Sequence, residues 1–270
     1  MNILTDRERL LRVLPYEDVD RGVYGVHTGP WPETLLRWQS EGLPKEVDLA
    51  TWCNANLPER DRWDWQGSWF FPYPAFERKI VSEDDRTVLY INHEGILMRE
   101  RKDQPFSSMP QFVKFPVENA KEFRAFAKER LQPNFAERLG PKGIADLREK
   151  KNRVYPLIVI ADRWGGFFGP LRNLTGVETL CTLFYDNISL VEEMMDTICD
   201  FLIEMIDQLL TYTDIDVFGF WEDMAYKTGP LISPDFVKRY MVPRYRKVVD
   251  FLRSRGVKWI ALDSDGQVSD

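Results

Sequence analysis

The sequence has few of the side chains that usually build metal and redox sites. Its 270 residues include two histidines, His27 and His93, and three cysteines, Cys53, Cys181 and Cys199. No His-x-x-x-His or Cys-x-x-Cys pair occurs, so a conventional zinc site lacks its ligands. A sparse, odd set of cysteines is typical of reduced thiols and predicts a cytoplasmic protein.

Long apolar runs, an excess of basic residues and glycine-rich phosphate loops are also lacking. No run of about 18 apolar residues occurs, and the N-terminal stretch is charged where a signal peptide would be apolar. The net charge of -7 argues against nucleic acid as a partner, because phosphate binding needs a basic surface. The absence of Rossmann and P-loop spacings argues against an open nucleotide-binding sheet. We therefore expect a small-molecule substrate and no membrane or nucleic-acid partner.

The chain does contain enough apolar material for one substantial core. Hydrophobic residues make up 44% of it and charged residues 29%, which is a globular composition. A chain of 270 residues is long for one domain but common for α/β barrels. Without a repeat or a flexible linker, residues 1–270 are predicted to form a single domain. The nine tryptophans could fill its core, line a pocket for a flat ligand or serve a homodimer.

The first half of the chain predicts short elements. Thr5, followed three residues later by Glu8, is typical of a helix N-terminus. The dense aromatic segment at residues 61–76 fits no regular period, and it could be a pocket lid or a packed loop. Further elements are expected as a first strand at 23–27, a hairpin at 87–101 and helices at 5–13, 33–42 and 117–130.

The second half alternates strands and helices. Continuous apolar runs at 155–162, 215–223 and 257–266 predict buried parallel strands. Between them lie an amphipathic helix at 189–212 and a helix that Ser233 caps. Such alternation implies right-handed crossovers and, without a phosphate loop, favours a (β/α)8 TIM barrel. Because the sequence stops directly after a strand, we expect the barrel's last strands and helices to be missing.

Each of these three late strands ends in acidic or aromatic residues. Functional groups of parallel α/β folds collect at the C-terminal ends of the strands. We therefore predict a catalytic set of four carboxylates: Asp263, Asp265, Glu222 and Asp223. Each acid could instead cap a turn or a helix. Oxygens of Asp263, Asp265 and Glu222 could also hold a metal ion, which leaves metal binding open.

Aromatic and cationic residues near these acids are candidates for substrate binding. A carboxyl group among aromatic rings has a raised pKa and can act as a general acid. Trp164, Phe168 and Trp221 could supply such a wall. Arg163 could hold an anionic substrate group or form a salt bridge with a neighbouring acid. His27, at the end of the expected first strand, faces the same rim, whereas His93 is expected at the surface.

Several stretches, in their order and spacing, resemble the uroporphyrinogen decarboxylase superfamily. They are residues 7–11 with the Asp20-Arg21 pair, 218–223 (FGFWED), 229–236 (GPLISPDF) with Pro243, and 262–266 (LDSDG). The resemblance implies a TIM barrel with a tetrapyrrole at its mouth. It also implies one of two activities: cofactor-free decarboxylation of uroporphyrinogen, or methyl transfer between corrinoid proteins and small molecules.

Two departures select among the branches of this superfamily. The decarboxylases carry a GRYLPE stretch with arginines for substrate carboxylates, where residues 25–33 here read GVHTGPWPE. The zinc-dependent thiol methyltransferases carry His-x-Cys-Gly where residues 263–266 here read DSDG. The remaining branch implies methyl transfer, with the corrinoid (cobalamin) supplied by a partner protein and none bound covalently. The alternatives are uroporphyrinogen decarboxylation in haem biosynthesis and non-catalytic binding of a tetrapyrrole or a corrinoid protein.

Overall fold

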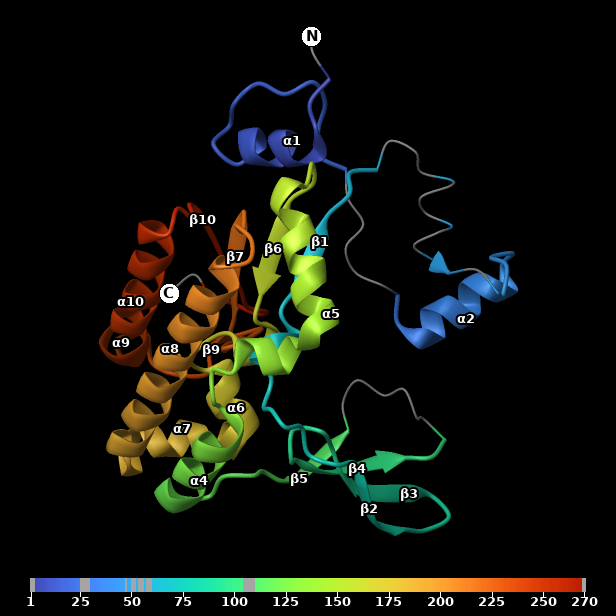
Figure 1. Ribbon diagram of the computed structural model, residues 1–270. Coiled ribbons are helices and arrows are strands. Elements are labelled where there is room, and N and C mark those ends of the chain that lie inside the picture. The colour runs from blue at the N-terminus through green and yellow to red at the C-terminus, as the bar shows by residue number, and fades with distance from the viewer. Residues whose placement is uncertain are drawn as a thin grey trace.

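The computed structural model describes residues 3–24, 30–46, 48–49, 52, 56, 60–103 and 110–268. At its centre is a four-stranded parallel sheet in the order β1-β6-β7-β10 (Figure 1). The strands are β1 (Asp64–Gln66), β6 (Leu157–Ile160), β7 (Val217–Trp221) and β10 (Trp259–Asp263). The prediction of a parallel α/β fold is confirmed, and all three late apolar runs form strands.

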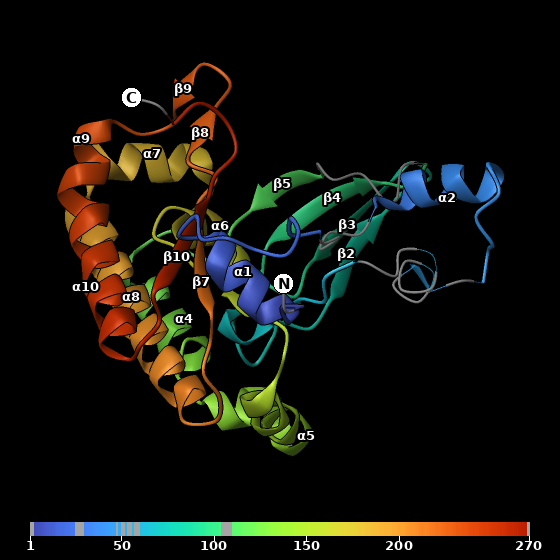
Figure 2. The same cartoon turned by 90° about the horizontal axis from the view of Figure 1, so that it is seen from above.

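Side chains alternate between the two faces of this sheet. One face is packed in the main core and carries Leu157, Val159, Phe218 and Phe220. The other face contributes Ile158 and Val217 to a smaller cluster with Leu10. The main core also takes side chains from the helices α4 (Ala120–Arg130), α5 (Phe135–Glu149), α6 (Gly169–Thr175), α7 (Val177–Asp186), α8 (Ile188–Leu210) and α10 (Val242–Ser254). Figure 2 shows α8 and α10 on one side of β7 and β10, with α1 (Asp6–Val13) on the other.

The two long helices of the second half begin where the sequence predicts. Asn187 caps α8 by accepting a hydrogen bond from the amide of Leu190. Ser233 caps the second helix, which runs through α9 (Pro234–Phe236) and a π-helical turn (Val237–Met241) into α10. The wide turn precedes Pro243, which lacks an amide hydrogen and cannot continue the regular bonding pattern. The expected single helix therefore forms, with a π-helical turn just before this proline.

The first strand of the sheet is not where the sequence predicts it. Residues 23 and 24 of the expected strand have no strand structure, and 25–27 lie outside the described residues. The first parallel strand is β1, inside the aromatic segment that fits no period. With three residues, it is too short to show an alternation. The helix predictions are confirmed: α1 has the Thr5–Glu8 capping box, and α2 (Pro32–Ser40) and α4 follow.

A second, antiparallel sheet is inserted between β1 and α4 and lies beside the parallel one (Figure 1). The predicted hairpin forms its centre, as β3 (Thr87–Ile91) and β4 (Leu97–Arg101), with Gly95 at a positive φ of 86° in the turn. Its outer strands β2 (Lys79–Glu83) and β5 (Gln111–Lys114) are exposed along their whole length. The sequence analysis missed both, because strands without a buried face leave no apolar alternation.

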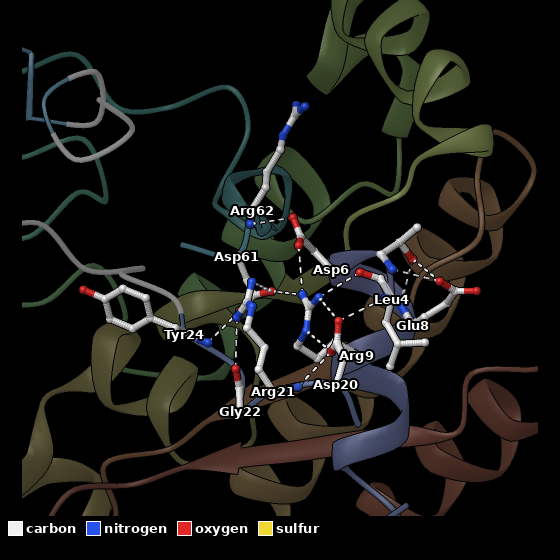
Figure 3. A network of polar contacts seen from close by, with 11 residues as sticks. Leu4, Asp6, Glu8, Arg9, Asp20, Arg21, Gly22, Tyr24, Asp61 and Arg62 are labelled. Atoms are coloured by element: carbon white, nitrogen blue, oxygen red, sulfur yellow. Dashed lines mark hydrogen bonds and ion pairs between the residues drawn. The ribbon is translucent and has the colours of Figure 1, made fainter. Parts of the chain in front are cut away.

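A buried arginine fastens α1 to the chain that leads into β1 (Figure 3). The Arg9 guanidinium donates to both carboxylate oxygens of Asp20, at 2.8 and 2.9 Å, and also to Asp6 and Asp61. Asp61 in turn accepts from Arg21 at 2.9 Å. These arginines hold the pKa values of the Asp20 and Asp61 carboxyls below their usual range. The Asp20-Arg21 pair therefore has a structural role in this network.

Candidate active site

The C-terminal ends of β7 and β10 are bound to each other. Trp221 and Asp263 are register partners, and parallel partners project to the same face. Beyond the strands, the Asp265 amide donates to Oδ1 of Asp223 at 3.0 Å, and the Met224 amide donates to Oγ of Ser264 at 3.3 Å. Hydrogen bonds thus join the C-terminal ends of β7 and β10, where the sequence predicts functional groups.

Glu222 lies on the opposite face from Trp221 and Asp263. Its side chain is completely buried beneath the loop that enters α6. It accepts from the amides of Phe167 and Phe168, both at 2.7 Å, and of Gly169 at 3.0 Å. The Tyr245 hydroxyl of α10 also donates to it. Burial raises the pKa of Glu222, and the four donors oppose this shift. The side chain is a structural anchor, and it does not converge with the other three acids as predicted.

The loop at residues 165–169 presses directly on the end of β7. A Cβ atom at Gly166 would lie 2.6 Å from Cδ of Glu222, and closer still to the carbonyl oxygen of Trp221. The aromatic neighbours of this loop are buried too. The Trp164 indole donates to Oε1 of Glu94 at 2.8 Å, and Phe168 has no exposed surface. Both belong to the core, so of the three predicted aromatic wall residues only Trp221 is partly exposed.

Three carboxylates remain together on the accessible side of the edge: Asp223, Asp263 and Asp265. Asp263 and Asp265 are exposed and Asp223 is half-buried. Partial burial, with the negative charges of Asp223 and Asp265, raises the pKa of the Asp263 carboxyl. Asp223 has a positive φ of 44°, which turns its side chain back toward the Asp265 amide. A carboxyl group with a raised pKa beside two other carboxylates can hold a proton and donate it.

An arginine that the sequence analysis missed completes this edge. The Arg172 guanidinium lies 4.8 Å from the centre of the Trp221 ring and donates to the Asp223 carbonyl at 3.3 Å. Burial lowers the pKa of Arg172, and the Asp223 carboxylate partly opposes this shift. No sequence motif marks Arg172, because only the fold of α6 brings it over Trp221.

The predicted substrate-binding residue Arg163 lies at the same edge. Its side chain forms no salt bridge with Asp162, although the Arg163 backbone amide donates to the Asp162 carboxylate at 2.7 Å. The Arg163 Nη1 atom lies 3.7 Å from Oε2 of Glu94, and about half of its side chain is exposed. His27, also predicted here, lies outside the described residues. The hairpin residue His93 is exposed, as expected.

Two cavities of about 450 and 500 Å³ lie at the other end of the sheet, sharing Asp214 and Arg255 in their walls. A smaller one of about 130 Å³ adjoins the acidic edge, between Met224, Pro234 and Val268.

Among the described residues, histidine, cysteine and acidic side chains form no group of three or more that could hold a metal ion. No helix in the described ranges has the length and apolarity needed to span a membrane.

The sequence matches no protein-family model, and its comparison with curated proteins gives no significant match.

Proposed function

We propose that the chain belongs to a (β/α)8 barrel enzyme of the uroporphyrinogen decarboxylase superfamily. Its reaction would be methyl transfer from a small donor to a corrinoid carried by a partner protein. The observation that carries this proposal is the Asp263 carboxyl, exposed on the open face of the sheet with a raised pKa. Asp263 acts as the general acid for the departing group of the donor.

The proposed step breaks the bond between the methyl carbon and an oxygen of the donor. The electron pair of that bond stays on the oxygen, which takes the proton of Asp263. The reduced corrinoid supplies the electron pair for the new bond to the methyl carbon. Asp223 and Asp265 favour the protonated form of Asp263 before the step, because a second and third negative charge disfavour its ionisation.

The charge of the edge favours a donor with little negative charge over uroporphyrinogen. Four carboxylates follow the strands here, against two arginines: Asp162, Asp223, Asp263 and Asp265, and Arg163 and Arg172. A substrate with eight carboxylates would meet like charges at this edge, which is unfavourable at close range. We therefore favour methyl transfer over decarboxylation as the proposed reaction.

Exposed apolar groups beside the edge suit a protein partner. The short strands β8 (Ala225–Tyr226) and β9 (Gly229–Pro230) lie next to the acidic loop, where the Gln267 amide donates to the Tyr226 carbonyl at 2.9 Å. Tyr226, Leu262 and Val268 each expose about half of their side chains here. Patches of this kind mark interaction sites.

The test is methyl transfer by the purified full-length protein, with reduced cobalamin replacing the protein-bound corrinoid. The donors are 4-methoxybenzyl alcohol and 4-methoxybenzoate, and methylcobalamin and the free phenol are quantified by chromatography. Asp263→Asn should lower the rate about 100-fold or more, since it removes a general acid. Asp250→Asn, at an exposed position of α10 away from the acidic edge, is the matched control and should keep the wild-type rate.

Three results would overturn this assignment. Equal rates for the Asp263→Asn variant and the wild type would remove Asp263 from the reaction. Formation of coproporphyrinogen from uroporphyrinogen, without methyl transfer, would assign decarboxylation instead. Binding of a corrinoid protein without any change in its methylation state would assign a non-catalytic role.

A further inference from the structure

Arg172 occupies an unusual position for a charged side chain. It is about three-quarters buried, and its guanidinium lies over the ring of Trp221. Its nearest carboxylate oxygen, Oδ2 of Asp223, lies 3.8 Å from Nη2, beyond hydrogen-bonding distance. Among the described residues, its one hydrogen bond goes to the Asp223 carbonyl. The guanidinium therefore keeps donors free for a ligand while the aromatic ring fixes its plane.

Arg163 brings a second cation to the same place. The Asn173 side-chain amide donates to the Arg163 carbonyl at 3.0 Å, which ties Arg163 to α6, the helix that carries Arg172. The nearest carboxylate to the Arg163 guanidinium, on Glu94, is also beyond hydrogen-bonding distance at 3.7 Å. The other oxygen of Glu94 accepts from the Trp164 indole, so Glu94 forms an ion pair with Arg163 without a direct hydrogen bond to it. An anion between these two arginines would take charge-assisted hydrogen bonds from both.

We propose that Arg172, supported by Trp221 and Arg163, binds a single carboxylate of the substrate. This inference rests on the proposed function and names its substrate class: a methyl donor that carries one carboxylate. Trp221 is the register partner of Asp263, so the anion site and the general acid flank one residue of the sheet. The substrate that this arrangement points to is a short aromatic or aliphatic acid. One negative charge suits this pair of arginines, whereas a polyanion would meet the neighbouring aspartates.

Titration calorimetry with the purified full-length protein tests the anion site without turnover. The two ligands are 4-methoxybenzoate and the neutral, similarly sized 4-methoxybenzyl alcohol. The wild type should bind the benzoate more tightly. Arg172→Met keeps much of the packing on Trp221, and it should weaken benzoate binding about tenfold or more while leaving alcohol binding unchanged. Arg172→Lys should fall between the two, because lysine keeps the charge and loses the planar fork.

Two further variants complete the test. Arg253→Met, at an exposed position on α10, is the matched control and should bind both ligands as the wild type does. Arg163→Met, at a half-exposed position, should weaken benzoate binding by a smaller factor and serves if Arg172→Met does not fold. Equal wild-type affinity for the two ligands would overturn the anion site, as would a variant that weakens both alike.

The methyl-transfer assay with the same two donors separates the two proposals. Preferential benzoate binding without transfer from either donor would sink the proposed function and leave the anion site standing. Transfer from both donors at equal kcat/KM would keep the proposed function and remove the anion site.

Discussion

Glu222 and Asp263 are acidic residues at the same edge of one sheet, yet they occupy opposite environments. Glu222 faces the helices, without exposed surface, and four donors hold its carboxylate. Asp263 faces the open side, and its surroundings are other carboxylates. The alternation of side chains along a strand produces this difference between neighbouring strands. A carboxylate at a strand end is therefore a structural anchor or a reactive group according to the face that the helices cover.

The largest expected effect on stability comes from substituting Glu222, the buried acid. Glu222→Gln should lower the free energy of unfolding by about 3 kcal/mol, because an amide nitrogen would replace an oxygen that accepts backbone hydrogen bonds and would leave buried donors unpaired. Urea denaturation measures this loss. Glu204→Gln, at an exposed position of α8, should stay within about 0.5 kcal/mol of the wild type. If Glu222→Gln were as stable as that control, the contrast between the two faces would fail.

A smaller loss is expected from crowding the loop against β7. Gly166→Ala should cost about 1–3 kcal/mol, because its Cβ would collide with the Trp221 carbonyl and the Glu222 carboxylate. Gly22→Ala is the control, since a Cβ there meets no atom within 4 Å. Thermal unfolding of the two variants gives the comparison. Equal melting temperatures would show that the loop gives way without strain.

The smallest effect concerns the pH dependence of stability, and its sign differs between two regions. The pKa of Asp263 is raised, so its contribution is greatest below the unfolded pKa and is lost as the pH rises through the folded value. Asp263→Asn should remove this pH-dependent part of the free energy of unfolding. We expect it to be under about 1 kcal/mol at such an exposed site. The pKa values of Asp20 and Asp61 are lowered, so their contribution is present above about pH 4 and is lost as the pH falls further.

Urea denaturation measured at several pH values from below to well above the ordinary carboxyl pKa of about 4 separates the two contributions. In a plot of the free energy of unfolding against pH, Asp20→Asn should flatten the fall at acid pH. Asp263→Asn should flatten the change at the higher pH values where the Asp263 carboxyl ionises. A variant that changes the opposite part of the plot would contradict the pKa direction given for that residue.

The sequence predicted the second half of the fold better than the first. The strands β6, β7 and β10 are apolar runs bounded by polar residues, and α8 has a long amphipathic period, so local patterns suffice. By contrast, β1 has three residues, and β2 and β5 have no buried face. Their pairing depends on segments distant in the sequence.

The candidate site, too, could be predicted from the sequence only in part. That acids would gather at this edge follows from the parallel strands, and Asp223, Asp263 and Asp265 do lie together. Runs that are apolar on both faces do not reveal which face the helices cover, so the burial of Glu222 could not be predicted. Arg172 lies in a helix with no distinguishing motif, and its place over Trp221 depends on how that helix packs.

The position of Glu94 has a consequence for motion. This residue sits in the hairpin turn of the antiparallel sheet, while its carboxylate holds the Trp164 indole and faces Arg163. A tilt of that sheet would therefore move a negative charge relative to an arginine of the proposed anion site. A ligand that tilts this sheet by binding its exposed strands β2 or β5 would change the distance between the Glu94 carboxylate and Arg163, and with it the affinity for the substrate.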